Sequence, residues 1–89
     1  MVKVHLVVMG RVQGVLYRAN TKKKAEELLL CGYAKNLPDG SVEVIAQGPK
    51  TKVDELVEYC MHGHDCAYVE DIDIEYSDNE EDIDKFEIK

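Results

Sequence analysis

The chain has 89 residues, of which 45% are hydrophobic and 33% charged, a balance typical of soluble globular proteins. This length suits one domain over residues 1–89, with a core that needs neither disulfides nor metal. No apolar run approaches the roughly 20 residues of a membrane helix, and no signal-peptide pattern opens the chain. We therefore expect a cytoplasmic protein with no membrane partner.

The net charge of −7 is unevenly distributed. Residues 1–52 carry a net charge of +5, whereas residues 53–89 carry −12. Because the acidic half would repel a long polyanion, this pattern favours a small anionic ligand over nucleic acid. The three cysteines form no C-x-x-C pair, and an odd number indicates reduced thiols rather than a secreted disulfide framework.

The first half of the chain predicts a strand, a helix and a hairpin. Apolar residues alternate over 3–9, which is typical of a strand with one buried face. A helix follows over 18–31, with Ala25, Leu28 and Leu29 as its apolar stripe and Gly32 as its C-terminal cap. Strands over 33–37 and 41–47 flank a turn that contains Pro, Asp and Gly in order.

The second half predicts a second helix and two strands. Apolar residues recur at helical spacing over 50–62, preceded by a Thr51–Asp54 capping box and followed by Gly63. A strand over 67–76 changes phase, so one of its faces stays buried only if a bulge near residues 70–71 absorbs a residue. After an acidic loop, Phe86 and Ile88 indicate a short last strand.

The order β-α-β-β-α-β predicts an α+β fold of the ferredoxin-like, split βαβ type. In this sandwich an antiparallel sheet carries two helices on one face. Because many unrelated activities use this architecture, the fold alone does not establish a function.

The loop between the first strand and the first helix has the features of an anion site. It reads Gly10-Arg11-Val12-Gln13-Gly14-Val15-Leu16-Tyr17-Arg18. Backbone N–H groups at a helix N-terminus lack internal partners, and the helix dipole favours negative charge there. Gly14 lets the backbone approach a ligand, and Arg18 offers a planar cationic fork for phosphate oxygens. The loop matches neither a Walker sequence nor a dinucleotide fingerprint.

These residues resemble the signature of the acylphosphatases, G-[RK]-V-Q-G-V-x-[FY]-R. A second family block, an aromatic-x-[RK]-Asn run followed by a turn and a Val-rich strand, is matched by residues 33–44, which begin Tyr33-Ala34-Lys35-Asn36. Tyr17 stands where the family more often has Phe, so its hydroxyl must find a partner or reach water. The resemblance implies the same ferredoxin-like fold and an enzyme that hydrolyses acyl phosphates without a cofactor.

The resemblance also implies roles for single residues. Arg18 would bind the phosphoryl group and Asn36 would orient the attacking water. The phosphate-binding loop would comprise Gln13, Gly14, Val15, Leu16, Tyr17 and Arg18. Phosphate or sulfate would bind there as a product-like ligand. We expect a monomer acting on a small molecule.

Two other interpretations remain open. A module of the same fold could bind a small anion without turning it over. Separately, the run Cys60-Met61-His62-Gly63-His64-Asp65-Cys66 places four metal-ligand residue types close together, although its spacing differs from that of zinc fingers and ribbons. This run raises either a metal site or a Cys60–Cys66 disulfide as a hypothesis, beside the simpler interpretation of ordinary helix-end residues.

Overall fold

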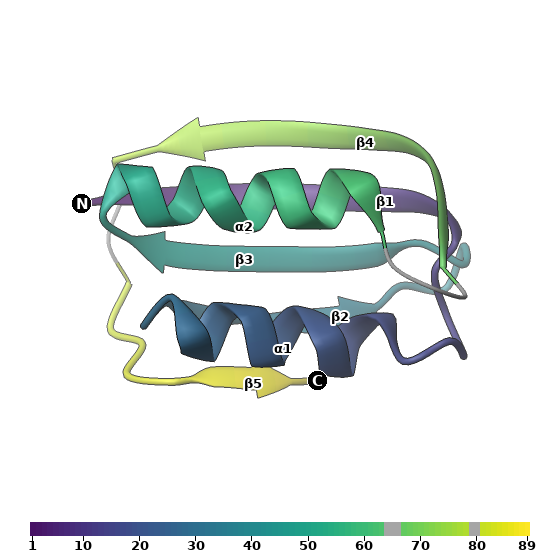
Figure 1. Cartoon of the computed structure of the whole chain (residues 1–89), viewed down its shortest axis with the longest axis horizontal. Coiled ribbons are helices and arrows are strands. Elements are labelled where there is room, and N and C mark those ends of the chain that lie inside the picture. Colours follow the sequence, from purple (N-terminus) through teal and green to yellow (C-terminus); the bar gives the residue numbers. More distant parts are fainter. Residues whose placement is uncertain (64–66, 79–80) are drawn as a thin grey trace.

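The computed structural model describes residues 1–63, 67–78 and 81–89. In this part of the chain two helices cover one face of a five-stranded sheet (Figure 1). The elements in chain order are β1 (Val2–Arg11), α1 (Tyr17–Glu27), β2 (Cys31–Asn36), β3 (Val42–Gly48), α2 (Lys50–His62), β4 (Tyr68–Ser77) and β5 (Phe86–Ile88).

The strands lie in the order β4-β1-β3-β2-β5. The four longer strands pair antiparallel, whereas β5 pairs parallel with β2. The predicted ferredoxin-like class is confirmed. The prediction of a wholly antiparallel sheet is wrong at the edge formed by β5. The chain reverses after β4 and crosses to the far side of the sheet, so its last strand must run in the direction of β1 and β2.

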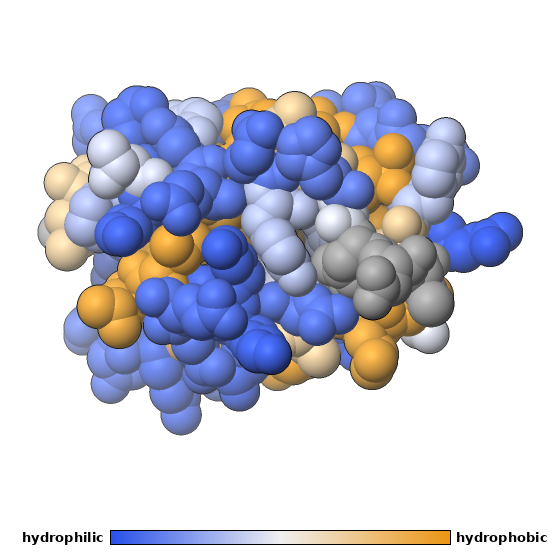
Figure 2. Space-filling model, viewed as in Figure 1, coloured by the Kyte–Doolittle hydropathy of each residue, from blue (hydrophilic) through white to orange (hydrophobic). Residues whose placement is uncertain are grey.

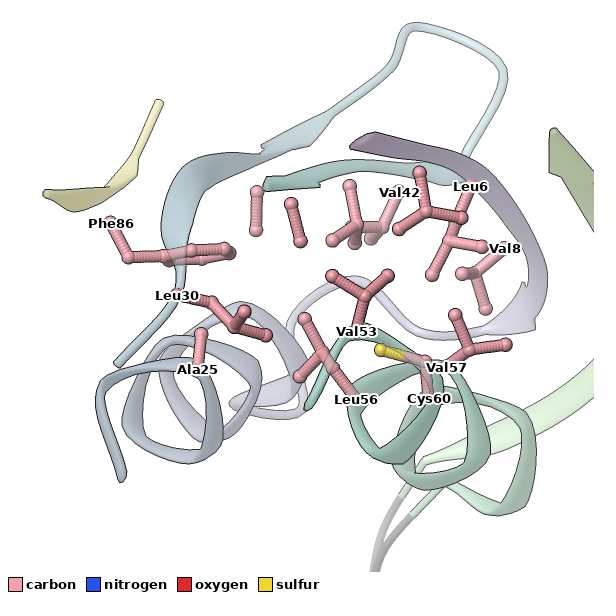
Figure 3. Close-up of a cluster of buried hydrophobic side chains, with 14 of the residues drawn as sticks. Leu6, Val8, Ala25, Leu30, Val42, Val53, Leu56, Val57, Cys60 and Phe86 are labelled. Carbon is pink, nitrogen blue, oxygen red and sulfur yellow. The ribbon is translucent and has the colours of Figure 1, made fainter. Parts of the chain in front are cut away.

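The core lies between the sheet and the two helices. Val4, Leu6 and Val8 on β1 are fully buried, as their alternation predicts, and β3 contributes alternate residues to the same face. From α2, an apolar stripe points toward them (Figure 3); its members are Val53, Leu56, Val57 and Cys60. The outer surface of the helices is mainly hydrophilic (Figure 2). Neither described helix is long and apolar enough to span a bilayer.

Helix α1 ends earlier than its sequence predicts. The chain leaves the helix at Leu28, and Leu29 adopts a left-handed conformation with φ 59° and 87% exposure. The Leu30 N–H then donates to Ala25 O (2.9 Å) and the Leu29 N–H to Glu26 O (3.1 Å). These are the two bonds of a Schellman cap, which usually has glycine where Leu29 stands. The predicted stripe therefore loses Leu29, and the predicted cap Gly32 lies inside β2.

The predicted bounds of α2 and its end at Gly63 are confirmed. The predicted Thr51–Asp54 capping box is wrong, because Pro49 occupies the N-cap and no side chain caps the helix. The predicted bulge in β4 is present: Met9 pairs with Asp71 and Gly10 with Val69, so β4 holds one extra residue, Glu70.

The face of the sheet opposite the helices carries a hydrogen-bonded carboxylate. His5 Nε2 lies 2.8 Å from Glu43 Oε2, and the Tyr33 hydroxyl donates to Glu43 Oε1 at 3.0 Å. The hydrogen bond with His5, followed by the one from Tyr33, lowers the pKa of Glu43 below its ordinary value of 4.5, against the opposing effect of burial. This group therefore links β1, β2 and β3 across the open face.

We predict that Glu43→Gln reduces the dependence of the unfolding free energy on pH in the acidic range. Because the folded-state pKa of Glu43 is lowered, its contribution is complete at pH values above its unfolded pKa and is lost as pH falls through the folded value. The variant should lose on the order of 1 kcal/mol of unfolding free energy at pH 7 and less at acidic pH. Urea unfolding at a series of pH values measures this, with the exposed Glu55→Gln as control. Parallel profiles for wild type and Glu43→Gln would contradict the prediction.

Candidate functional site

A pocket of about 250 Å³ lies where the β1–α1 loop enters the helix. Its lining consists of Val12, Gly14, Leu16, Tyr17, Arg18, Ala19 and Ile88. The Asn20 N–H donates to Leu16 O at 3.0 Å, which is the first bond of α1. The N–H groups of the preceding turn consequently have no acceptor within the helix, and they lie at its positive end.

Two left-handed residues shape this loop. Gly14 has φ 73° and Leu16 has φ 64° and ψ 18°. Left-handed residues interspersed in a turn bring successive N–H groups into a concave arrangement that suits an anion. Glycine adopts this conformation without strain, whereas leucine does so only at a cost.

Arg18 is half-buried in the first turn of α1, and a contact with the end of the sheet restrains it. Its Nη1 donates to Lys89 O at 2.8 Å. Lys89 is held in turn, since its N–H donates to Ala34 O at 2.8 Å and its Nζ lies 4.4 Å from the centre of the Tyr33 ring. Because a guanidinium carries five N–H donors, this contact leaves others for a ligand.

The Gln13 side chain connects the loop to the β2–β3 hairpin. Its Nε2 donates to both Leu37 O and Ser41 O, each at 2.8 Å. The Leu37 N–H also donates to Ser41 O at 2.8 Å, closing the turn between β2 and β3. The Gln13 side-chain amide therefore binds both residues that close this turn. Sequence analysis predicts Gln13 only as part of the phosphate-binding loop. It does not predict this bridge, because the partners of Gln13 lie 24 and 28 residues away in the chain.

Asn36 ends β2, one residue before the carbonyl that Gln13 holds. It pairs with Val42 at the end of the β2–β3 ladder. Its Oδ1 is buried and has no hydrogen-bond partner among the described residues. An unpaired buried acceptor costs about 1–3 kcal/mol, so the burial of this atom does not stabilise the fold.

The predicted loop residues differ in what they do. Gly14, Leu16, Tyr17 and Arg18 line the pocket, whereas Val15 packs partly against the core. The Tyr17 hydroxyl is buried and donates to Cys60 O at 2.8 Å, so the expected partner is present. Burial raises the pKa of Tyr17, so it is neutral at ordinary pH and anchors the loop to α2.

The hypothesised metal or disulfide site includes His64 and Cys66, which lie outside the described residues. Cys60 is buried on the core side of α2, and burial raises its thiol pKa to about 11. His62 is exposed and lies 3.0 Å from Glu58 Oε1. These two members of the run therefore differ sharply in burial, and the described residues contain no group of three or more metal-ligand side chains.

Comparison with known proteins identifies the family. A family model described as Acylphosphatase matches residues 4–88. An acylphosphatase of Haloarcula marismortui is 42% identical over 87 residues, covering 98% of this chain and 94% of the relative. The crystal structure of acylphosphatase from Bacillus subtilis superimposes with a TM-score of 0.96 at 35% identity, covering 100% and 99% of the two chains. The structure of an acylphosphatase from Coxiella burnetii superimposes with a TM-score of 0.91 at 38% identity, covering 98% of this chain and 90% of that chain. The chain therefore belongs to the acylphosphatase family, enzymes that hydrolyse acyl phosphates.

Proposed function

We propose that this chain hydrolyses carboxyl-phosphate mixed anhydrides in the pocket at the N-terminus of α1. Backbone N–H groups of residues 13–18 and the Arg18 guanidinium bind the phosphoryl group. Asn36 orients the attacking water. The products are a carboxylate and inorganic phosphate, and phosphate or sulfate binds the same loop as a product-like ligand.

Arg18 stabilises the negative charge on the equatorial phosphoryl oxygens as the transition state forms. Its place in the first turn of α1 adds its full charge to the partial charge of the helix terminus. The bond to Lys89 O limits the motion of the guanidinium, so less side-chain entropy is lost when substrate binds.

The pocket at the N-terminus of α1, with Arg18 in its lining, is the observation that carries this proposal. Asn36 does not line that pocket, and its buried Oδ1 must be uncovered by a side-chain rotation before it can meet a water. A neutral amide is too weak a base to deprotonate water, but its carbonyl oxygen accepts a hydrogen bond from a water proton. A water held in this way directs a lone pair toward phosphorus. Because Gln13 fixes the neighbouring Leu37 carbonyl, Asn36 is tied to the loop that holds the phosphoryl group.

The chemistry of the leaving group fits this small set of residues. An acyl phosphate expels a carboxylate, whose conjugate acid has a pKa of about 4, so no general acid is needed. Phosphoryl transfer through a loose transition state requires mainly in-line positioning and charge stabilisation. Backbone donors and one arginine supply both.

We further propose that the enzyme acts without a metal or other cofactor, as a monomer, in the cytoplasm. Its substrate is a small molecule rather than nucleic acid, because residues 53–89 carry a net charge of −12.

We predict that Arg18→Ala and Asn36→Ala each reduce kcat/KM for an aromatic acyl phosphate by on the order of 10²-fold or more. Hydrolysis is measured with a chelator present. Arg11→Ala, which removes an exposed arginine at the end of β1, is the matched control and should retain activity.

Stability separates a chemical role of Asn36 from a structural one. Removing an unpaired buried acceptor should leave the unfolding free energy of Asn36→Ala unchanged or raise it. Loss of activity together with loss of stability would count against the water-orienting role. If folded wild type binds phosphate but leaves acyl phosphates intact, the chain is an anion-binding module instead.

We predict that Gln13→Glu destabilises the chain by about 2 kcal/mol, because it removes two donated hydrogen bonds and points a carboxylate at two carbonyl oxygens. It should also lower kcat, since the loop is no longer tied to the β2–β3 hairpin that carries Asn36. Gln47→Glu is the matched control: Gln47 donates one bond at an exposed site, to Glu81 O at 2.9 Å.

Urea unfolding and steady-state kinetics measure both effects. The control should lose less stability than Gln13→Glu and keep its kcat. Equal stability losses, or an unchanged kcat in Gln13→Glu, would show that the bridge does not position the site.

A further inference from the structure

Leu16 is placed where its side chain contributes little to folding. It is 74% exposed, and its φ of 64° is a conformation that disfavours any residue with a Cβ. As the N-cap of α1 it forms no side-chain capping bond. Glycine would suit the backbone here, and Ser, Thr, Asn or Asp would suit the cap. A bulky apolar side chain in this place is therefore unexplained by stability.

The pocket gives Leu16 a neighbour of the same kind. Ile88, 41% exposed on β5, lines the pocket from the opposite end of the sequence. The Arg18–Lys89 bond holds the residue after Ile88 against the first turn of α1, which keeps Ile88 at the pocket. The pocket thus has polar groups at Gly14 and Arg18 and exposed apolar side chains at Leu16 and Ile88.

We propose that Leu16 and Ile88 form an apolar subsite for the acyl group of the substrate. This inference rests on the proposed function, because it assigns the phosphoryl group to the loop and the remainder of the molecule to these side chains. Substrates with an aromatic or branched aliphatic acyl group remove Leu16 and Ile88 from water on binding, whereas an acetyl group covers little of either. The enzyme therefore selects acyl phosphates with large apolar acyl groups.

Leu29 provides a matched control within the chain. It is also an exposed leucine in a left-handed conformation, with φ 59° and 87% exposure, but it caps the other end of α1 and does not line the pocket. Leu→Gly at either position relieves the same backbone strain. Only the change at Leu16 removes apolar surface from the proposed subsite.

The test compares benzoyl phosphate with acetyl phosphate for wild type, Leu16→Gly, Leu16→Asn and Leu29→Gly. The ratio of the two kcat/KM values should fall about 10-fold in both Leu16 variants, the scale of a lost apolar contact in a pocket. It should stay at the wild-type value in Leu29→Gly. Leu16→Asn keeps a side chain that tolerates the left-handed conformation, so a fall in both Leu16 variants excludes loop flexibility as the cause.

Binding of the non-hydrolysable analogues benzoylphosphonate and acetylphosphonate, measured by calorimetry, gives a readout independent of turnover. The preference for the benzoyl analogue should fall in the Leu16 variants and persist in Leu29→Gly. An unchanged preference in the Leu16 variants would overturn the subsite. If wild type binds both analogues but hydrolyses neither acyl phosphate, the proposed function is wrong. The ratio of the two analogue affinities in wild type and the Leu16 variants would then still test the subsite.

Discussion

The burial of one face of β1 is the constraint on which the rest of the structure depends. This strand is hydrogen-bonded to β3 on one side and β4 on the other, and its alternate residues Val4, Leu6 and Val8 are fully buried under the helices. Because a shift of one residue would expose all three, the register is strongly fixed. The loop that follows therefore begins from a rigid point, and buried Val12 extends that rigidity to its first turn.

Features that cost stability gather around this loop. Leu16 holds a strained backbone conformation, and Asn36 Oδ1 is buried without a partner among the described residues. Each costs on the order of 1 kcal/mol or more, and neither improves the core. Strain and unpaired polar atoms persist where the surroundings over-determine them, and here the Gln13 bridge and the Tyr17–Cys60 bond do so. The proposed chemistry gives both features a use.

Much of the fold follows from the sequence because strand alternation and helical spacing record burial directly. The bulge at Glu70 is an example, since the phase change in β4 requires it. The end of α1 was missed because Leu29 fills a left-handed cap that local rules reserve for glycine. The signature loop was evident from resemblance, but the Gln13 bridge depends on carbonyls brought close only by the β2–β3 pairing. Long-range contacts of this kind leave no local pattern.

A phosphate titration followed by backbone and side-chain amide NMR tests the central claim most directly. We expect saturable shifts at the backbone amides of residues 13–18 and at the Asn36 side-chain amide. We also expect a Kd equal to the inhibition constant of phosphate for acyl phosphate hydrolysis. Shifts centred elsewhere on the chain, or a Kd unrelated to inhibition, would contradict a site at the N-terminus of α1.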